Sequence, residues 1–283
     1  YGGEAVGRTD AGAVVFVWGA MPGEEVLVEI TDKRRRFWRG QVREVLVASP
    51  ERVTPGCPIF AVCGGCQWQY MSYAAQVEAK QTILLDQVRP VYPEARERLR
   101  PALAMTVPWN YRNVAHFVGN EQGVPSFRRW QSHELVEVPS CPITQEPVNA
   151  ALPQYHGDLY PGERLSLRTT AGGDQLQAWR GEGEGGRLLV ETVLDRRYRV
   201  SPRAFFQVNT KLEQRPPLTW HPAAAPDPAA APTSLTEDMV RLVLEGVEGY
   251  ADRTVIDAYS GVGLFALPLA TVAPRVIGIE EAA

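Results

Sequence analysis

The hydrophobic positions of the first fifty residues come in short runs that glycine and proline interrupt. Residues 13–17 form a compact apolar run, and residues 25–30 partly alternate between apolar and polar side chains, as a half-buried strand does. Residues 41–47 supply a further strand. Several short strands separated by glycine and proline predict a small β-barrel of the oligonucleotide-binding kind over residues 1–49.

After residue 50 the spacing of apolar residues changes from that of short strands to a mixture of helix and strand. Residues 73–88 carry apolar side chains at helical spacing, and residues 165–168 and 188–190 read as strands around a glycine-rich turn at 181–186. We therefore expect residues 50–214 to form a central α+β domain.

A stretch rich in proline and alanine, residues 216–234, predicts an extended surface loop. A helix resumes over residues 237–244 with Thr236 as its N-cap, and a strand then enters a glycine turn over residues 253–263. Residues 275–280 predict the next strand. Residues 215–283 are thus expected to begin a Rossmann-like α/β domain, which makes the whole chain a multidomain α/β protein.

The composition is that of a globular protein, with 45% hydrophobic and 22% charged residues. No apolar run approaches the ~20 residues that a transmembrane helix needs, and no secretory signal pattern opens the chain. We expect a cytoplasmic, monomeric protein with no membrane partner.

The net charge of −4 argues weakly against a nucleic-acid partner, but the basic residues are unevenly distributed. Six of them fall between Lys33 and Arg43. Of these, Arg34, Arg35 and Arg36 are expected in a loop between two strands, where a barrel can meet a phosphate backbone. A solvated turn is the alternative.

The four cysteines are Cys57, Cys63, Cys66 and Cys141. The first three lie close together in a segment rich in glycine and proline, and the fourth follows 75 residues later. Three thiolates on a tight loop with one distant thiolate favour an iron–sulfur cluster with four cysteine ligands. A zinc site usually has two close pairs, and structural disulfides are rare in cytoplasmic proteins, so both remain weaker alternatives.

A glycine turn follows the strand that ends at Asp257. It contains Gly261 and Gly263, and Glu280 ends the next predicted strand, 23 positions after Asp257. Such a turn allows a ligand to approach the backbone, and an acidic residue at that place can accept hydrogen bonds from ribose hydroxyls. The third glycine of the dinucleotide fingerprint is missing, which favours S-adenosylmethionine over NAD.

Together these segments closely resemble the RNA 5-methyluridine methyltransferase family, in its iron–sulfur branch with an N-terminal TRAM barrel. The resemblance rests on five motifs, at residues 52–57, 63–69, 111–113, 132–133 and 201–209. It implies that Gln207, Tyr259 and Glu280 contact S-adenosylmethionine and that Arg112 and Phe205 lie near the target uracil. It also implies a [4Fe-4S] cluster held by the four cysteines.

The chain departs from the family at several places. Ser260 stands where many members have cysteine, and Val114 replaces a residue that is often basic. The family attacks uracil carbon 6 with a cysteine that follows an Asp-Pro-Pro-Arg motif, which this sequence lacks. We therefore assign no catalytic residue here, and expect the nucleophile beyond residue 283 of a longer protein.

The resemblance implies an enzyme that methylates uracil carbon 5 in structured RNA. Ribosomal RNA of the large subunit (23S rRNA) is the preferred substrate, because barrel and cluster together are similar to that branch, and transfer RNA is the alternative. A non-catalytic RNA-binding or redox-sensing iron–sulfur protein is the rival from another class.

Overall fold

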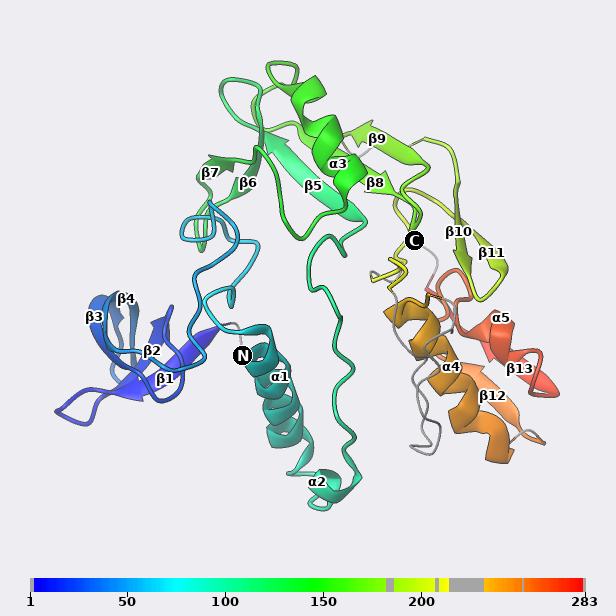
Figure 1. Cartoon of the computed structure of the whole chain (residues 1–283), viewed down its shortest axis with the longest axis horizontal. Helices are drawn as coiled ribbons and strands as arrows, with labels where there is room; N and C mark the ends of the chain where they lie inside the picture. The colour runs from blue at the N-terminus through cyan, green and yellow to red at the C-terminus, as the bar shows by residue number, and fades with distance from the viewer. Residues whose placement is uncertain (1–2, 182–185, 207–208, 214–231, 251, 282–283) are drawn as a thin grey trace. The chain divides into compact units, whose positions relative to one another are not determined.

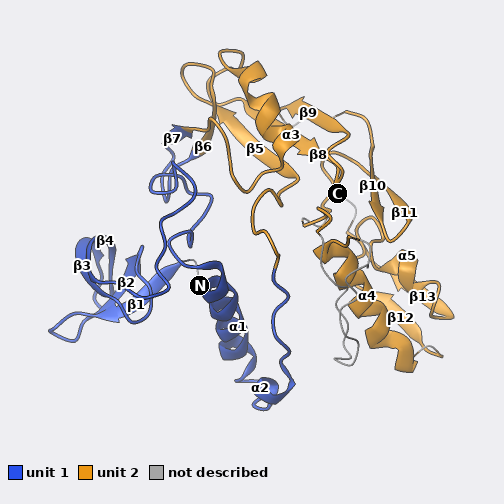
Figure 2. Ribbon diagram, viewed as in Figure 1, with its two compact units in different colours: residues 1–104, 128–136 blue, residues 105–127, 137–283 orange. Residues whose placement is uncertain are grey.

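The structure is a computed structural model that describes residues 3–181, 186–206, 209–213, 232–250 and 252–281 (Figure 1). The chain divides into two compact units (Figure 2). Unit 1 contains residues 1–104 and 128–136, and unit 2 contains residues 105–127 and 137–283. The finer division at residues 49 and 214 stays a prediction.

Unit 1 begins with a four-stranded sheet in the order β1-β2-β4-β3. Its strands are β1 (Glu4–Arg8), β2 (Val14–Trp18), β3 (Glu25–Lys33) and β4 (Trp38–Val47). Val15, Val17 and Ala20 are buried, and apolar side chains of β3 and β4 pack on them. The strands expected from the alternation are therefore confirmed.

The closed barrel that we expected is not formed, because among the described residues β1 and β3 do not pair and the sheet remains open. An alternating pattern is the same in an open sheet and in a barrel, since it reports only which face is buried. Closure depends on strand tilt and stagger, which the pattern does not encode.

Helix α1 (Tyr73–Val88) has the bounds that its apolar spacing predicted, and the short helix α2 (Ala95–Arg98) follows. Ser72 caps α1, since its hydroxyl accepts a hydrogen bond from the backbone N–H of Ala75 at 3.2 Å. Within the described residues, no helix is both long and apolar enough to cross a membrane.

A buried ion pair fastens the sheet of unit 1 to the segment that precedes α1. The Glu24 side chain is fully buried and accepts hydrogen bonds from Arg52 and from the backbone N–H groups of Met21 and Ser49. Burial alone would raise the pKa of Glu24, but these hydrogen bonds hold it below its ordinary value. The β2–β3 turn and residues 49–52 are thus held together.

The sheet that carries most of the core of unit 2 has the strand order β7-β6-β5-β8-β9. Its strands are β5 (Val114–Gly119), β6 (Pro125–Arg128), β7 (Leu135–Glu137), β8 (Arg164–Thr169) and β9 (Leu176–Arg180). Helix α3 (Glu146–Ala151), continued by a 3-10 turn η1 (Leu152–Tyr155), packs on β8. Phe117, Leu165 and Leu167 are completely buried.

The rest of unit 2 joins a hairpin to the start of an α/β layer. The elements are β10 (Leu189–Val193), β11 (Arg196–Val200), α4 (Leu235–Val247), η2 (Glu248–Tyr250), β12 (Thr254–Asp257), α5 (Ala266–Leu269) and β13 (Arg275–Gly278). Strands β12 and β13 pair in parallel, as adjacent strands of a Rossmann-like sheet do. Most of the predicted proline/alanine loop and of the 181–186 turn lies outside the described residues.

The N-cap of α4 is Ser234, so the expectation that Thr236 caps this helix was wrong. Ser234 accepts a hydrogen bond from the backbone of Glu237, whose carboxylate accepts one from the Ser234 N–H in return. With Thr236 as the cap, Met239 would take the place of Glu237, and a thioether cannot return the bond.

Candidate functional site

The glycine turn of the α/β layer is tied to both of its parallel strands. The ladder between β12 and β13 continues past its last pair, because the N–H of Ile279 donates to Asp257 O at 2.8 Å. The N–H of Ser260 then donates to Ile279 O at 3.0 Å. The turn after one strand is therefore held against the end of the other.

Both glycines of the turn have positive φ angles, +51° for Gly261 and +85° for Gly263. Glycine adopts this region without strain. A side chain at Gly263 would also place its Cβ 3.1 Å from the side chain of Leu267. The N–H of Gly261 donates to a carboxylate oxygen of Glu280 at 2.6 Å, so the structure brings Glu280 to the turn that the sequence paired with it.

Two further predicted cofactor residues flank the turn. Tyr259 is 91% exposed, which leaves its ring available to a ligand. One carboxylate oxygen of Asp257 is buried and has no hydrogen-bond partner among the described residues. A buried acceptor without a donor is costly. These acceptors therefore fit a ligand that donates from hydroxyl or amino groups, such as a nucleoside. Gln207 lies outside the described residues.

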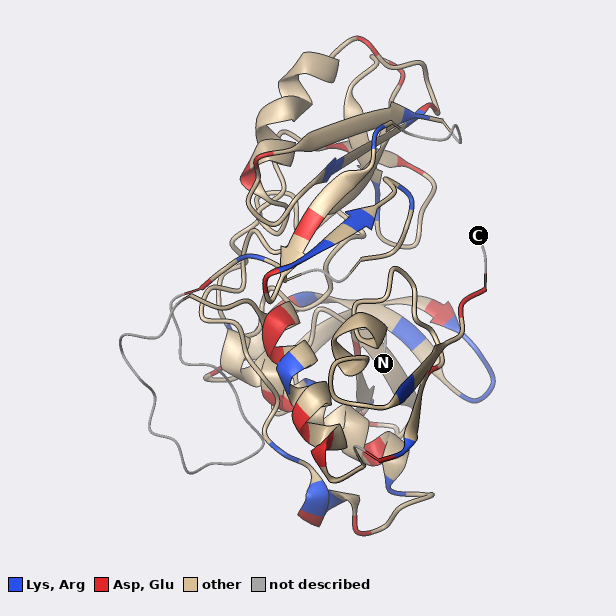
Figure 3. Ribbon diagram, turned by 90° about the vertical axis from the view of Figure 1, so that its right-hand side faces the viewer, with Lys and Arg blue, Asp and Glu red and all other residues tan. Residues whose placement is uncertain are grey.

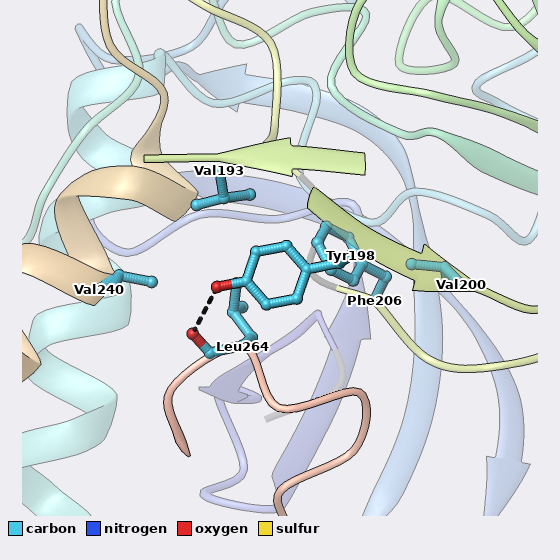
Figure 4. Close-up of a cluster of buried hydrophobic side chains, with 6 residues drawn as sticks. All are labelled: Val193, Tyr198, Val200, Phe206, Val240 and Leu264. Atoms are coloured by element: carbon cyan, nitrogen blue, oxygen red, sulfur yellow. Dashed lines mark hydrogen bonds between the residues drawn. The ribbon is translucent and has the colours of Figure 1, made fainter. Parts of the chain in front are cut away.

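The segment after β11 packs directly on the glycine turn. Phe206 is buried in a cluster with Tyr198, Val193, Val240 and Leu264 of the turn (Figure 4). The Tyr198 hydroxyl donates to the backbone oxygen of Leu264 at 3.4 Å.

The neighbouring Phe205, by contrast, is 74% exposed. One aromatic ring thus anchors the segment, and the adjacent one is presented to solvent.

Arg112 lies on a stretch of chain that contacts the other end of the same segment. The N–H of Asn209 donates to Tyr111 O at 3.3 Å, and Arg112 itself is exposed. Asn209 has a φ of +63°, a conformation that asparagine tolerates better than most residues. Burial first, and then the charges of Arg164 and Arg112, lower the pKa of nearby His116. His116 therefore lies within reach of the charge of Arg112.

The basic loop that joins β3 to β4 is drawn blue in Figure 3. Lys33 lies over the ring of Trp38 at 4.3 Å, and Arg34 pairs with Asp32 at 2.7 Å. Arg35 and Arg36 are exposed and form no ion pair within the described part of the chain. The loop offers cationic side chains to an anionic partner.

Three of the predicted metal ligands lie in unit 1. Cys63 is buried, and its sulfur accepts a hydrogen bond from the N–H of Gly65 at 3.4 Å. Cys57 and Cys66 pack on an apolar cluster formed by Met21, Phe60, Tyr70 and Met71. The loop therefore has an apolar setting and one N–H···S bond, both of which are common around thiolate ligands.

The fourth cysteine, Cys141, belongs to unit 2, where Asn149 exchanges hydrogen bonds with its backbone at 2.9 and 3.0 Å. Within the described residues, no group of three or more His, Cys, Asp or Glu side chains is assembled to hold a metal ion. The iron–sulfur ligand set thus stays a prediction.

Comparisons with known proteins give one matching domain family and several similar proteins. Residues 1–47 match the TRAM domain family. An uncharacterized RNA methyltransferase of Gloeobacter violaceus is 28% identical over 99% of this chain and 70% of its own length. One of Thermosynechococcus vestitus is 29% identical over 98% and 70%, and one of Listeria innocua is 38% identical over 56% and 35%.

A solved structure shares the fold. The tRNA (uracil-54, C5)-methyltransferase of Pyrococcus abyssi, in complex with S-adenosyl-L-homocysteine, superposes with a TM-score of 0.60 at 17% identity. The match covers 95% of this chain and 70% of that one. The fold class is therefore that of a Rossmann-like methyltransferase with an N-terminal TRAM domain. The chain is thus similar over nearly its whole length to proteins named RNA methyltransferases, and its first 47 residues match a TRAM domain.

Proposed function

We propose that the protein transfers a methyl group from S-adenosylmethionine to carbon 5 of uracil in structured RNA. The observation that carries the proposal is the packing of the Phe205–Phe206 segment on the glycine turn. Phe206 packs on Leu264 of the turn whose Gly261 N–H donates to Glu280, and the neighbouring Phe205 is exposed. A base-stacking group and a nucleoside-binding turn are what a methyltransferase acting on a flipped base requires.

Each residue of the proposed site has its own role in binding the cofactor or the RNA. Asp257 and Glu280 accept hydrogen bonds from the cofactor, Tyr259 packs on it, and Phe205 stacks on the uracil. Arg112 neutralises a nearby phosphate. When bound, S-adenosylmethionine supplies an electrophilic methyl group.

Uracil carbon 5 becomes nucleophilic when a cysteine thiolate adds to carbon 6. Carbon 5 then takes the methyl group, a carboxylate base removes its proton, and elimination frees the thiolate. Neither the thiolate nor the base is assigned to a residue among 1–283.

The preferred substrate within this proposal is 23S rRNA. The TRAM domain and the cysteine-rich segment support it through their resemblance to that branch of the family, whereas the solved relative acts, by its name, on transfer RNA. The test is to offer both RNAs, purified from cells that lack the gene, with S-adenosylmethionine labelled in its methyl group. Label in 23S rRNA alone supports the preference, and label in transfer RNA alone overturns it. Label in neither favours the non-catalytic rival.

We also propose that Cys57, Cys63, Cys66 and Cys141 hold a [4Fe-4S] cluster with a structural role. The hydrogen bond from Gly65 to the Cys63 sulfur and the apolar cluster beneath the loop support this assignment. No redox step is needed for the methylation, so a cluster would serve to hold distant cysteines together.

The basic loop gives a prediction for RNA binding. Replacing Arg35 and Arg36 by glutamine is expected to weaken binding of every structured RNA similarly, because contacts to phosphate carry no sequence information. The slope of log K against log[salt] should fall by about 1 for each arginine that no longer neutralises a phosphate. Titrations over a range of salt concentrations measure both effects.

The matched control for this loop is Arg96→Gln with Arg98→Gln in α2, which removes the same charge from the same unit. An equal loss of RNA affinity in the control would contradict a role specific to the β3–β4 loop.

A further inference from the structure

Arg168 is a cation inside the core of unit 2 that the motifs did not single out. It lies near the end of β8 and is only 2% exposed. A charged side chain is rarely buried so deeply unless other groups compensate its charge. The sequence signal that could have found it is an arginine in the predicted strand of residues 165–168.

The groups that compensate this charge are backbone carbonyls of one short turn. Nη1 of Arg168 donates to Ser201 O at 3.2 Å, Pro202 O at 3.2 Å and Ala204 O at 2.6 Å. These carbonyl oxygens converge on one nitrogen, and without a cation between them they would repel one another. Hydrogen bonds from a charged donor are the stronger kind, so the guanidinium holds the turn in one conformation.

Glu191 on β10 is a buried acidic group whose charge acts on Arg168, although no ion pair joins the two among the described residues. Its side chain is 1% exposed and accepts a hydrogen bond from the N–H of Ala171 at 2.9 Å. Burial lowers the pKa of Arg168 and raises the pKa of Glu191, and the charge of each residue opposes the shift of the other. The two groups therefore support each other's ionised forms.

The turn that Arg168 holds leads directly into the aromatic pair. Phe206 is fixed in the core with Tyr198 and Leu264, and Phe205 stands between it and the turn. Because the backbone is held on both sides of Phe205, the Phe205 side chain has little freedom to change its direction. Release of the turn at 201–204 would leave Phe205 anchored on one side only.

We propose that Arg168 is a positioning residue that sets the direction of Phe205 toward the target base by holding the carbonyls of residues 201–204. The role rests on the proposed function, because it is the methylation of a flipped uracil that needs Phe205 in a fixed place. The cofactor turn is held by its own strands and does not depend on Arg168.

The test uses the double variant Arg168→Met/Glu191→Gln, which removes both buried charges together. A change in this variant then reports the loss of the contacts to residues 201–204 and not an uncompensated buried charge. Removing arginine alone would take a positive charge away from the vicinity of a buried carboxylate, which is destabilising in itself. Glutamine removes that charge and keeps an oxygen for the N–H of Ala171. Arg168→Lys, which keeps the charge with fewer donors, and Arg164→Met, which removes an exposed charge from the same strand, complete the set.

Two properties are measured on each variant, local opening and catalysis. Hydrogen exchange of the backbone amides at residues 204–206 is expected to become about tenfold faster in the double variant, since local opening becomes easier. The kcat/KM for RNA should fall roughly 10- to 100-fold through misplacement of Phe205. The affinity for S-adenosyl-L-homocysteine should fall less than kcat/KM does, because the glycine turn is held by its own strands and Gln207 is the one predicted cofactor contact next to the released residues.

Arg168→Lys should lie between the wild type and the double variant in both properties, and Arg164→Met should match the wild type. Wild-type exchange in the double variant overturns the proposal, as does faster exchange with an unchanged kcat/KM. If the wild-type protein methylates no RNA, the proposed function fails separately, and exchange at residues 204–206 alone decides whether Arg168 holds the turn.

Discussion

Replacing Glu280 by alanine is expected to lower the affinity for S-adenosyl-L-homocysteine by about 10- to 100-fold, because hydrogen bonds from the ligand to a charged acceptor are lost. Glu280 is exposed and its carboxylate contacts the N–H of Gly261. Water can replace it there, so the fold should survive the change. Isothermal titration calorimetry measures the affinity, and thermal unfolding checks the fold.

The matched control is Glu281→Ala, which removes the same charge from the next exposed position. Its affinity should equal that of the wild type. Equal losses in the two variants would mean that only the net charge of this end of the chain matters, and would contradict the role of Glu280 at the turn.

Replacing Cys63 by serine is expected to remove nearly all of the iron, about four atoms per chain, and the visible absorption of the cluster. The midpoint of thermal unfolding should fall by roughly 10 °C, because metal binding contributes directly to the folding free energy. Anaerobic purification followed by iron and sulfide analysis measures the first effect, and differential scanning calorimetry measures the second.

The control for the cysteine is Phe60→Leu, which loosens the apolar cluster beneath the loop and keeps every thiol. This variant should unfold at a lower temperature and still contain iron. A wild-type protein that contains one zinc and no iron would contradict the assignment, as would full iron content in the Cys63→Ser variant.

The sequence predicted local structure well where one physical signal dominated. The bounds of α1 followed from apolar spacing, and β12, the glycine turn and β13 followed from the order of strand, glycine and acid. Glu280 could be paired with the turn because parallel strands end at the same edge of a sheet. In each of these cases the determining residues lie close together in the chain.

The features that were missed depend on contacts between distant segments. The open edge of the four-stranded sheet follows from strand pairing, which alternation does not report. The packing of Phe206 on Leu264 joins residues 58 positions apart, and Arg168 reaches a turn that follows another hairpin. The roles of Gly261 and Arg112 could be proposed from sequence motifs. The role of Arg168 could be inferred only from its hydrogen bonds to three backbone carbonyls in the structure.

The measurement that tests the central claim most directly uses RNA that carries tritium at carbon 5 of its uridines. Methylation at carbon 5 must expel that hydrogen, so the proposal predicts one tritium released into water for each methyl group transferred from S-adenosylmethionine. Methyl transfer without tritium release would place the reaction at another atom. The absence of both transfer and release would contradict the assignment of this protein as a uracil-C5 methyltransferase.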